Sequence, residues 1–379
     1  MPALANKNYF NYGGQGPLPN SSLEAMVSCW QKIQQLGPFG RDVWPWLNHE
    51  QSALRKALSQ FCGVTPNRIT LTENVSSGCV IPLWGLPFDP GDRLLISDAE
   101  HPGIVAACRE LARRHRLEID FFPVQQVRDP AQLLVTLSES LKNRTRLVVL
   151  SHLLWNTGIT MPIAQVAHQL KSHPREPWLL VDAAQSVGSM ELEDAPNQAD
   201  IFAFTGHKWC CGPEGLGAVV LSERILQQAS PTLIGWRSLS NETAGDCNWH
   251  QDGRRFEVAT SCVPLGAGLR QSLRLLQSWG DGSKRQARIC QLSARLWRGL
   301  TEIPGVEPLL QQEPPASGLV SFRVANQDPN QLVEELAERG FQLRSLADPI
   351  CVRACTHITS TEKEIDLLLN NLANICEGR

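Results

Sequence analysis

Strongly apolar segments alternate with amphipathic segments over residues 68–222. The segments RLVVLSHLL (146–154) and WLLVDAAQ (178–185) are almost continuously apolar, which is typical of strands covered on both faces. Between them, IAQVAHQLKSH (163–173) has apolar positions at helical spacing. Because strands and helices alternate in this way, the pattern predicts β-α-β units, with a mostly parallel sheet between layers of helices.

Shorter segments extend this series on both sides. A helix is expected to open near His101, because Pro102 suits a first helical turn, and another is expected over 134–143. Further strands are expected at RITLT (68–72), DRLLISD (92–98), EIDFFPV (118–124), DIFAFTGHK (200–208) and LGAVVLS (216–222). Together these segments predict a sheet of seven strands. The small and polar residues ENVSSG (73–78) read as a turn after the first strand.

The pattern changes after about residue 260. The expected elements there are helices over 265–280 and 284–300, a strand over 318–324, a helix over 329–340, a strand over 351–358 and a last helix near Ser360, whose sequence resembles a capping arrangement. This composition predicts a smaller α+β domain. A chain of 379 residues also exceeds the ordinary size of one core. We therefore expect an N-terminal segment (1–17) associated with the small domain, a large ligand-binding domain (18–262) and a small C-terminal domain (263–379).

Composition and charge narrow the class of protein. Apolar residues make up 42 % of the chain and charged residues 19 %, as in ordinary globular proteins. The formal net charge of −3 gives no electrostatic reason to expect nucleic acid or an anionic membrane as partner. No apolar run has the length of a membrane span, and the start MPALANKNYF lacks the pattern of a signal peptide. A cytoplasmic enzyme is expected.

The 12 cysteines do not indicate a metal site. No C-x-x-C occurs, and neither the group Cys351, Cys355 and His357 nor the adjacent Cys210 and Cys211 has zinc-site spacing. Several cysteines lie inside apolar patterns, where they read as small buried side chains. No metal is predicted.

The pair Asp182 and Lys208 carries the first indication of chemistry. Asp182 ends an apolar strand, where open α/β sheets place their ligand crevice. A carboxylate buried there needs a cation, and a protonated pyridine nitrogen would supply one and improve the ring as an electron sink. Lys208 follows the next strand, and an apolar setting would lower its pKa as a Schiff-base amine requires. Alone, Asp182 reads equally as a helix cap or ion-pair partner, and Lys208 as a surface lysine. The combination predicts pyridoxal 5′-phosphate (PLP) as cofactor.

Several strings resemble the class V aminotransferase family. These are TGHKWCCGPEGLG, with VDAAQS and AEHPGI upstream, and the similarity runs from YFNYGGQGPLP (9–19) to VRACTHITSTEKEID (352–366). That family includes cysteine desulfurases and selenocysteine lyases. The resemblance implies the fold-type I PLP architecture, an α/β fold with a large domain and a smaller α+β domain.

The resemblance implies roles around the cofactor ring. Lys208 matches the lysine that carries PLP and moves the Cα proton, Asp182 the partner of the pyridine nitrogen, and Gln185 a neighbour of the phenolic oxygen. His101 matches the histidine that stacks on the ring, although alone it reads as a helix-start residue. Trp155, in SHLLWNTG, stands where the family usually has Asn near the cofactor oxygen. It reads equally as a core aromatic.

Phosphate and subunit contacts follow from the same resemblance. Val75 and Ser76 match the loop that holds the phosphate, and a helix N-terminus there is a sensible anion site. Thr205 and His207 resemble the other phosphate contacts. Thr260 resembles a residue that reaches the phosphate of the neighbouring subunit. The resemblance therefore implies a homodimer.

Substrate contacts are expected near the C-terminus. Arg353 matches the arginine that binds the substrate α-carboxylate, since a guanidinium can hold a carboxylate through two parallel hydrogen bonds. Without the motif it reads as an ordinary strand arginine. Desulfurases carry a catalytic cysteine on a loop shortly before this arginine, and here the aligned place falls near Asp348-Pro349. Cys351 is badly placed for persulfide chemistry, which needs a mobile, ionisable thiolate.

Within the family, the segments YFNYGGQGPLP, SHLLWNTG, FTGHKW, GWRS, RFEVATS and RSLADPICVRAC are similar to the cyanobacterial L-cysteine/L-cystine C–S lyases. This implies β-elimination that yields pyruvate, ammonia and cysteine persulfide or sulfide, a possible sulfur source for iron–sulfur clusters through a sulfur-acceptor protein. Arg344 is the candidate for the distal carboxylate of cystine, and Gly13 and Gly14 for the lining of the same entrance.

Other functions stay open at this point. A cysteine desulfurase or selenocysteine lyase would release alanine instead of pyruvate, and epimerisation or sulfoxide cleavage are other chemistries of the family. A dinucleotide-binding oxidoreductase is disfavoured because YGGQG does not continue as G-x-G-x-x-G. A non-catalytic iron–sulfur assembly scaffold would leave the pairing of Asp182 with Lys208 unexplained.

Overall fold

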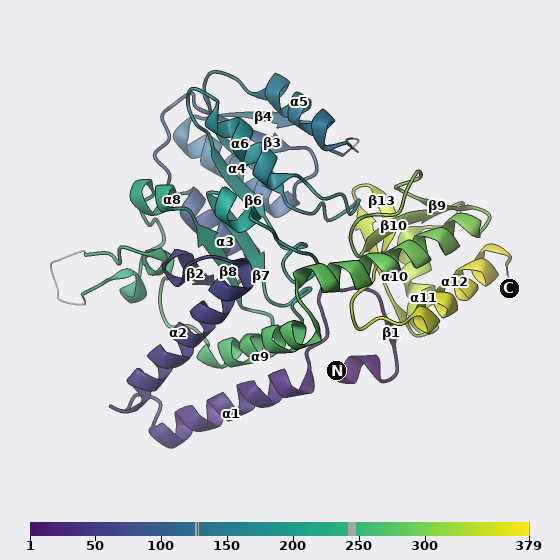
Figure 1. Cartoon of the computed structure of the whole chain (residues 1–379), viewed down its shortest axis with the longest axis horizontal. Helices are drawn as coiled ribbons and strands as arrows, with labels where there is room; N and C mark the ends of the chain where they lie inside the picture. The colour runs from purple at the N-terminus through teal and green to yellow at the C-terminus, as the bar shows by residue number, and fades with distance from the viewer. Residues whose placement is uncertain (126, 128, 242–247, 379) are drawn as a thin grey trace.

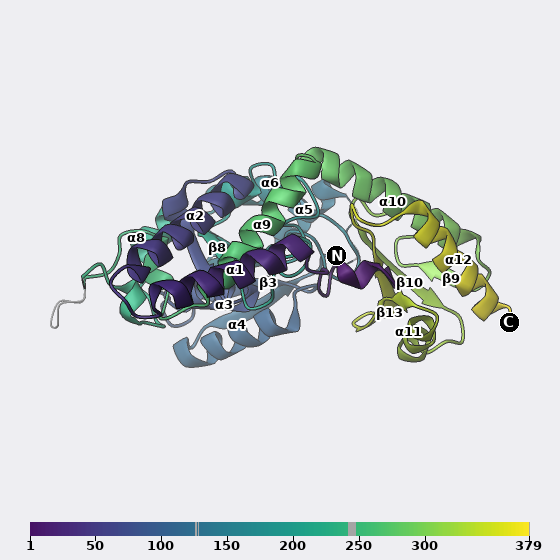
Figure 2. The ribbon, with the colours of Figure 1, turned by 90° about the horizontal axis from the view of Figure 1, so that it is seen from below.

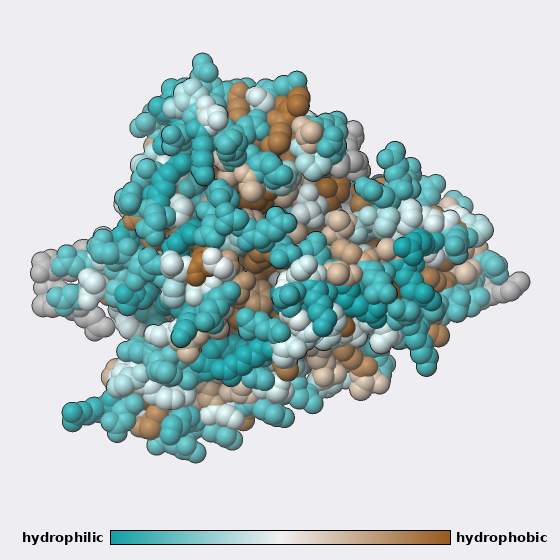
Figure 3. Space-filling view, in the orientation of Figure 1, coloured by the Kyte–Doolittle hydropathy of each residue, from teal (hydrophilic) through white to brown (hydrophobic). Residues whose placement is uncertain are grey.

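The computed structural model describes residues 1–125, 127, 129–241 and 248–378. The chain forms a larger part built on a seven-stranded sheet and a smaller part built on a four-stranded sheet (Figure 1). The N-terminus lies near the smaller part, and the C-terminus lies at its outer end (Figure 1). The face in Figure 3 is mostly polar, with apolar residues in small areas near its centre.

The large sheet confirms the predicted α/β architecture. Its order is β2-β8-β7-β6-β5-β3-β4, and β8 runs antiparallel to both neighbours while the other pairs are parallel. The strands are β2 (Ile69–Thr72), β3 (Arg93–Ser97), β4 (Glu118–Phe122), β5 (Thr145–Ser151), β6 (Trp178–Asp182), β7 (Ile201–Thr205) and β8 (Gly217–Leu221). The parallel strands therefore bring their carboxyl ends to one edge, where the candidate residues of β6 and β7 meet.

Helices cover both faces of this sheet, as the continuous apolar strands predict. On β6, Leu179 and Val181 face one apolar cluster while Trp178 and Leu180 face the other. Helices of the first cluster are α2 (Val43–Cys62), α5 (Pro130–Ser140), α6 (Ile163–Lys171) and α9 (Val263–Trp279). Helices of the second are α3 (Val75–Leu83), α4 (Pro102–His115) and α8 (Glu223–Gln228). A short helix, α7 (Ala195–Gln198), precedes β7.

The smaller part is an antiparallel sheet packed against helices. Its strand order is β12-β13-β10-β9, and its elements are β9 (Val306–Pro308), β10 (Leu319–Val324), β12 (Arg344–Ala347), β13 (Ile350–Cys355), α10 (Gly282–Glu302), α11 (Pro329–Glu338) and α12 (Glu362–Cys376). Thr361 and Glu364 form a capping box at the start of α12, which confirms the capping arrangement expected near Ser360.

The N-terminal segment joins the two parts. Strand β1 (Asn8–Tyr9) pairs in parallel with β11 (Phe341–Gln342) of the smaller part. Further along, the backbone N–H of Gly16 donates to the carbonyl of His207, in the loop that carries Lys208 (2.7 Å). This path brings residues 10–16 between the two parts.

Three local features differ from the expectations. The predicted strand 146–154 ends at Ser151, because the next residues turn into a hairpin closed by a bridge between Leu153 and Thr160. The segment 73–78 is only briefly a turn, since α3 begins at Val75 with Asn74 as its N-cap. Residues 20–62 fall outside every predicted element and form α1 (Asn20–Leu36) and α2.

The packing of α9 bears on the domain limits. Helix α9 lies against α1 and α2, beside the large sheet (Figure 2), whereas the limits expected from the sequence assign it to the small domain. The division into 1–17, 18–262 and 263–379 stays a prediction, and this packing favours a second limit near the junction of α9 and α10. No helix in the described ranges combines the length and apolar character needed to cross a membrane.

Candidate active site

Asp182 and Lys208 meet at the carboxyl edge of the large sheet. Asp182 is the last residue of β6 and is only 6 % exposed. Its Oδ1 accepts a hydrogen bond from the backbone N–H of Ala184 (2.9 Å), so it also orders the turn after the strand. Lys208 is partly buried in the loop after β7, the neighbour of β6. The charge of Asp182 acts on the Lys208 amine, and the pairing of Asp182 with a pyridine nitrogen stays a prediction.

Burial lowers the pKa of Lys208 to about 8, and burial is the largest of the influences on this pKa. The negative charge of Asp182 opposes this shift, while the positive charges of Arg353 and Arg344 reinforce it. A larger fraction of the amine is therefore neutral near physiological pH than for an exposed lysine. A neutral amine can form a covalent bond to a carbonyl carbon or accept a proton.

His101 and Trp155 lie side by side at this edge. The His101 ring packs edge-on against Trp155, with ring centroids 6.1 Å apart and an interplanar angle of 64°. Burial lowers the pKa of His101; Asp182 raises it and Lys208 lowers it. His101 Nδ1 also accepts from the backbone N–H of Gly103 (3.2 Å), so the residue caps α4. This confirms the helix-start interpretation of His101, whereas its stacking on the cofactor ring stays a prediction.

Two arginines stand opposite each other at the edge of the smaller part. Arg353 on β13 is 1 % exposed, and its Nη1 donates to the carbonyl of Trp155 (2.7 Å). Its Nε and Nη2 are buried without a nitrogen or oxygen partner in the described ranges. Arg344 is the residue directly across on β12, and it is exposed. Like charges placed opposite each other on one sheet face repel, so this pair favours an anion between or beside the guanidinium groups.

Gly13 provides the space in front of Arg353. A Cβ at Gly13 would come within 2.8 Å of Arg353 Nη2 and 3.0 Å of Gln185 Oε1. Gln185 Nε2 donates to the Gly13 carbonyl (3.0 Å), and Gln185 Oε1 accepts from Trp209 Nε1 (2.8 Å). Gly13, Gln185 and Arg353 thus form one contact group. Gly14 instead lies against the side chain of Asn11.

The expected phosphate contacts gather at the start of α3. Thr205 and Thr72 are both register partners of Gly217 on β8, so the carboxyl end of β7 lies close to the turn that leads into α3. Thr205 Oγ1 and His207 Nδ1 are hydrogen-bonded (2.7 Å). Val75 and Ser76 are the first two residues of α3, where backbone N–H groups lack helical partners. The arrangement suits an anion.

Thr260 lies apart from these groups. It is exposed in the segment before α9, where it lines a cavity of about 490 Å³ together with Thr72 and Glu73. Its expected contact is with another subunit, so this role stays a prediction.

The thiol of Cys351 is unsuited to sulfur transfer. Cys351 lies inside β13 and is fully buried. Burial raises its pKa to about 11, so the thiolate is scarce near neutral pH. This agrees with the expectation that a mobile, ionisable thiolate is not found at this place.

The sequence missed two polar side chains beside the site. Trp209 Nε1 donates to Gln185 Oε1. In the sequence, only the position of Trp209 next to Lys208 could have indicated this role. Glu100 is buried at the end of β3 and is bonded to Ser97 and Ser151. The sequence feature that could have indicated Glu100 is its position directly before His101 in AEHPGI.

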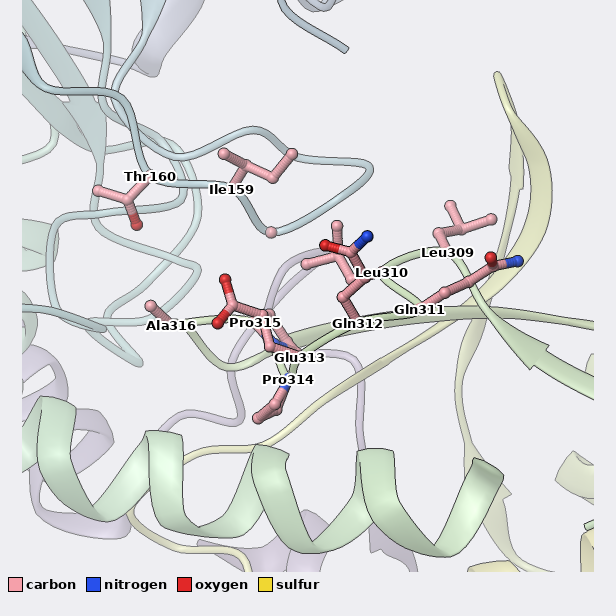
Figure 4. Close-up of a pocket in the computed structure, with 11 residues that line it drawn as sticks. Ile159, Thr160, Leu309, Leu310, Gln311, Gln312, Glu313, Pro314, Pro315 and Ala316 are labelled. Carbon is pink, nitrogen blue, oxygen red and sulfur yellow. The ribbon is translucent and has the colours of Figure 1, made fainter. Parts of the chain in front are cut away.

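A second cavity lies on the other side of the hairpin that follows β5. It measures about 410 Å³ and is lined by residues 158–160 and 309–316 (Figure 4). Figure 4 shows polar side chains of Gln312 and Glu313 on one side and Thr160 on the other. No candidate site residue lines this cavity.

Comparisons with known proteins agree with this geometry. The model of the family Aminotransferase class-V matches residues 47–368. The chain belongs to the class-V aminotransferase family. Isopenicillin N epimerase of Streptomyces clavuligerus is 28 % identical, over 98 % of this chain and 94 % of that protein. A cysteine desulfurase of Haloferax volcanii is 27 % identical, over 83 % of this chain and 76 % of that protein.

A solved structure gives a stronger similarity. It is the cystine C–S lyase C-DES in complex with its reaction product cysteine persulfide, and it is 42 % identical with a TM-score of 0.94. The match covers 98 % of this chain and 99 % of that chain. Another C-DES structure, a variant with glycine covalently linked to the PLP cofactor, has the same identity and TM-score.

Class-V aminotransferases use PLP, and this chain is a PLP-dependent enzyme. The residues fit the cofactor. A lysine with a lowered pKa lies within the field of a buried carboxylate, and the start of a helix suits the phosphate. Lys208, Asp182 and the first residues of α3 are the groups that would hold it.

Proposed function

We propose that this class-V aminotransferase family member is a carbon–sulfur lyase that carries out β-elimination on L-cystine and, less favourably, on L-cysteine. One cystine and one water give one pyruvate, one ammonia and one cysteine persulfide; cysteine gives sulfide in place of the persulfide. The similarity to C-DES over nearly the whole chain supports this assignment.

The facing pair Arg344 and Arg353 is the observation that carries the proposal. Cystine has a carboxylate at each end, and two guanidinium groups on neighbouring strands offer one partner for each. Arg353, with its two unpartnered nitrogens, binds the α-carboxylate of the half that reacts. Arg344 makes no ion pair within the described ranges, and it binds the distal carboxylate at the entrance to the site. The space left by Gly13 admits the proximal carboxylate.

Lys208 performs the acid–base work in this proposal. When bound, PLP supplies an electron sink for the electron pair that remains when the Cα proton leaves. The Nζ of Lys208 accepts that proton, which its lowered pKa favours. The Cβ–S bond then breaks and the sulfur leaves with the bonding electrons. A persulfide anion leaves more readily than a plain thiolate, which favours cystine over cysteine.

Cys351 separates this proposal from its nearest alternative. A cysteine desulfurase or selenocysteine lyase would release alanine, and a desulfurase needs a thiolate that attacks the substrate sulfur. The burial of Cys351 inside β13 and its raised pKa argue against that chemistry. Epimerisation, as in the named epimerase relative, would leave the carbon–sulfur bond intact. A non-catalytic scaffold would not need Lys208 and Asp182 together.

The enzyme is further proposed to act as a homodimer in the cytoplasm. The outer face of α1 exposes Leu23, Val27 and Trp30 in one stripe at helical spacing, which supports a partner on this side. Thr260 would then approach the phosphate site of the partner subunit. The persulfide product would pass to a sulfur-acceptor protein and so supply iron–sulfur cluster assembly.

Two variants test the function. Cys351→Ser should keep the rate of pyruvate formation from cystine within about twofold, whereas a desulfurase would lose alanine formation in this variant. Arg344→Ala should raise the KM for cystine about tenfold or more, since one charged contact is worth about 1.5–3 kcal/mol, while the KM for cysteine changes little. An Arg344→Ala enzyme with an unchanged preference for cystine would overturn the assignment of the distal contact.

A further inference from the structure

Glu100 is a buried carboxyl directly beneath the site. It lies between β3 and α4, next to His101, and is 6 % exposed. Its Oε1 accepts from the backbone N–H of Ser151 (2.7 Å) and from Ser97 Oγ, and its Oε2 accepts from Ser151 Oγ (2.8 Å). All three of these hydrogen-bond donors are neutral, so they do not cancel the charge of the carboxylate.

Glu100 and Asp182 share the same end of the sheet. Ser151, which holds Glu100, is the register partner of Asp182 across β5 and β6. The charge of Asp182 acts on Glu100. Cys79 from α3 also lies in the field of both carboxyl groups, and Cys108 from α4 lies in that of Glu100. Two carboxyl groups thus occupy one dry region beneath the cofactor site.

Opposing influences act on the ionisation of Glu100. Burial raises its pKa to about 7, the hydrogen bonds from Ser97 and Ser151 lower it, and the charge of Asp182 raises it. Two nearby carboxyl groups resist simultaneous ionisation. A cation placed beside Asp182 relieves that repulsion, and therefore favours the ionised form of Glu100.

We propose that Glu100 is a positioning residue that acts through Asp182: it releases a proton when a protonated pyridine nitrogen binds beside Asp182, and its negative charge strengthens the hold on that cation. The coupling is reciprocal. If the bound cation favours the ionised form of Glu100, then ionised Glu100 raises the affinity for the cation by the same factor. This goes beyond the proposed lyase activity. It needs PLP at the site, and it does not depend on which product is released.

A purely structural role is the alternative. In that role, Glu100 connects the start of α4, including His101, to the end of β5 through its hydrogen bonds with Ser151. Such a connection does not require a charge. An uncharged amide of the same shape preserves most of that connection while abolishing the ionisation. Glu100→Gln therefore separates the two roles.

The experiment counts protons during cofactor binding. Apoenzyme of the full chain is titrated with PLP by isothermal calorimetry at pH 6, 7 and 9, in buffers of different ionisation enthalpy. At pH 6 and 7 the wild type should release more protons than Glu100→Gln, because part of Glu100 is protonated before binding. At pH 9 the two proteins should agree, since Glu100 is already ionised. Protons exchanged by Lys208 are common to both proteins and cancel in the difference.

Equal proton counts for both proteins at pH 6 and 7 would overturn the proposal. If Glu100→Gln does not fold, as judged by near-ultraviolet circular dichroism, Ser151→Ala decides the question. That variant removes one donor to the carboxylate and should move the extra proton release to higher pH. An unchanged pH profile in Ser151→Ala would contradict the proposal. Because no product is measured, failure here is distinct from failure of the proposed lyase activity.

Discussion

Burial determines the acid–base behaviour of the residues around the site. The pKa of Lys208 is lowered because burial removes water from its amine, and the negative charge of Asp182 opposes this shift. Arg353 has two buried nitrogens, Nε and Nη2, that find no nitrogen or oxygen partner among the described residues. Leaving such groups unpaired is costly in a folded protein unless a ligand satisfies them. These residues are therefore arranged for a ligand with anionic and carbonyl groups.

The pH dependence of PLP capture should report the pKa of Lys208. Only the neutral amine attacks the carbonyl carbon of PLP, so the rate of capture by apoenzyme should rise between pH 7 and 9 with a midpoint near 8. Stopped-flow absorbance measures this rate. A midpoint above 10, as for an exposed lysine, would contradict the burial of this amine. Lys208→Ala, which cannot form the bond, serves as the control.

Single residues differ in how far the sequence could place them. Asp182 and Lys208 were predicted from their places after apolar strands and from the family resemblance, and Arg353 from the resemblance; in the structure the charges of Asp182 and Arg353 both act on Lys208. Glu100 was not singled out, because a glutamate is usually exposed and only tertiary contacts with Ser151 reveal its burial. The contact of Gly13 with Arg353 likewise depends on the path of the N-terminal segment.

At the level of elements, the ends of helices and strands supply the geometry of the site. Helix α3 begins where β2, β8 and β7 lie side by side, so its first turn, whose N–H groups lack helical partners, lies close to the end of β7. The pairing of β12 with β13 places Arg344 opposite Arg353. Neither arrangement involves neighbours in sequence.

A negative charge at the start of α3 should weaken phosphate binding. Ser76→Asp should lower the affinity for PLP at least tenfold, equivalent to about 1.4 kcal/mol, because the carboxylate repels the phosphate. The affinity for pyridoxal, which has no phosphate, should change by less than twofold. Fluorescence titration of apoenzyme measures both. Equal losses for the two ligands would mean that the phosphate lies elsewhere.

The sequence predicted elements well where apolar runs were long. The strands β6 to β8 lie within the predicted segments and β5 begins one residue before its segment, since strands buried on both faces leave a continuous apolar pattern. The extension of 146–154 beyond Ser151 was wrong, because Leu153 and Leu154 are buried in the hairpin that follows and not in the sheet. Strand order and the antiparallel course of β8 depend on long-range pairing, which an apolar pattern does not encode.

At the level of the whole molecule, two parts meet around the N-terminal segment. The large part supplies Asp182 and Lys208, and the small part supplies Arg344 and Arg353, while residues 10–16 contact both parts. Leu23, Val27 and Trp30 form an apolar stripe on the exposed face of α1. Helix α1 packs its other face on α9, so the stripe is available to a second copy of the chain.

Charge on that stripe should separate the proposed dimer. Leu23, Val27 and Trp30 are 48 %, 43 % and 42 % exposed, and Trp30→Asp should give a monomer at micromolar concentration. Phe121→Asp is a matched control, because Phe121 is also 48 % exposed but lies on β4 at the edge of the sheet. Sedimentation equilibrium gives the masses. A dimeric Trp30→Asp protein, or a monomeric wild type, would contradict the proposed interface.

The most direct test of the lyase assignment follows the carbon and sulfur of one substrate. Uniformly carbon-13-labelled L-cystine is supplied to the purified holoenzyme, and the products are quantified by NMR together with sulfane sulfur. We expect one pyruvate and one sulfane sulfur per cystine consumed, no alanine, and no pyruvate with Lys208→Ala. Alanine as the main product, or recovered substrate with inverted configuration at Cα, would contradict it.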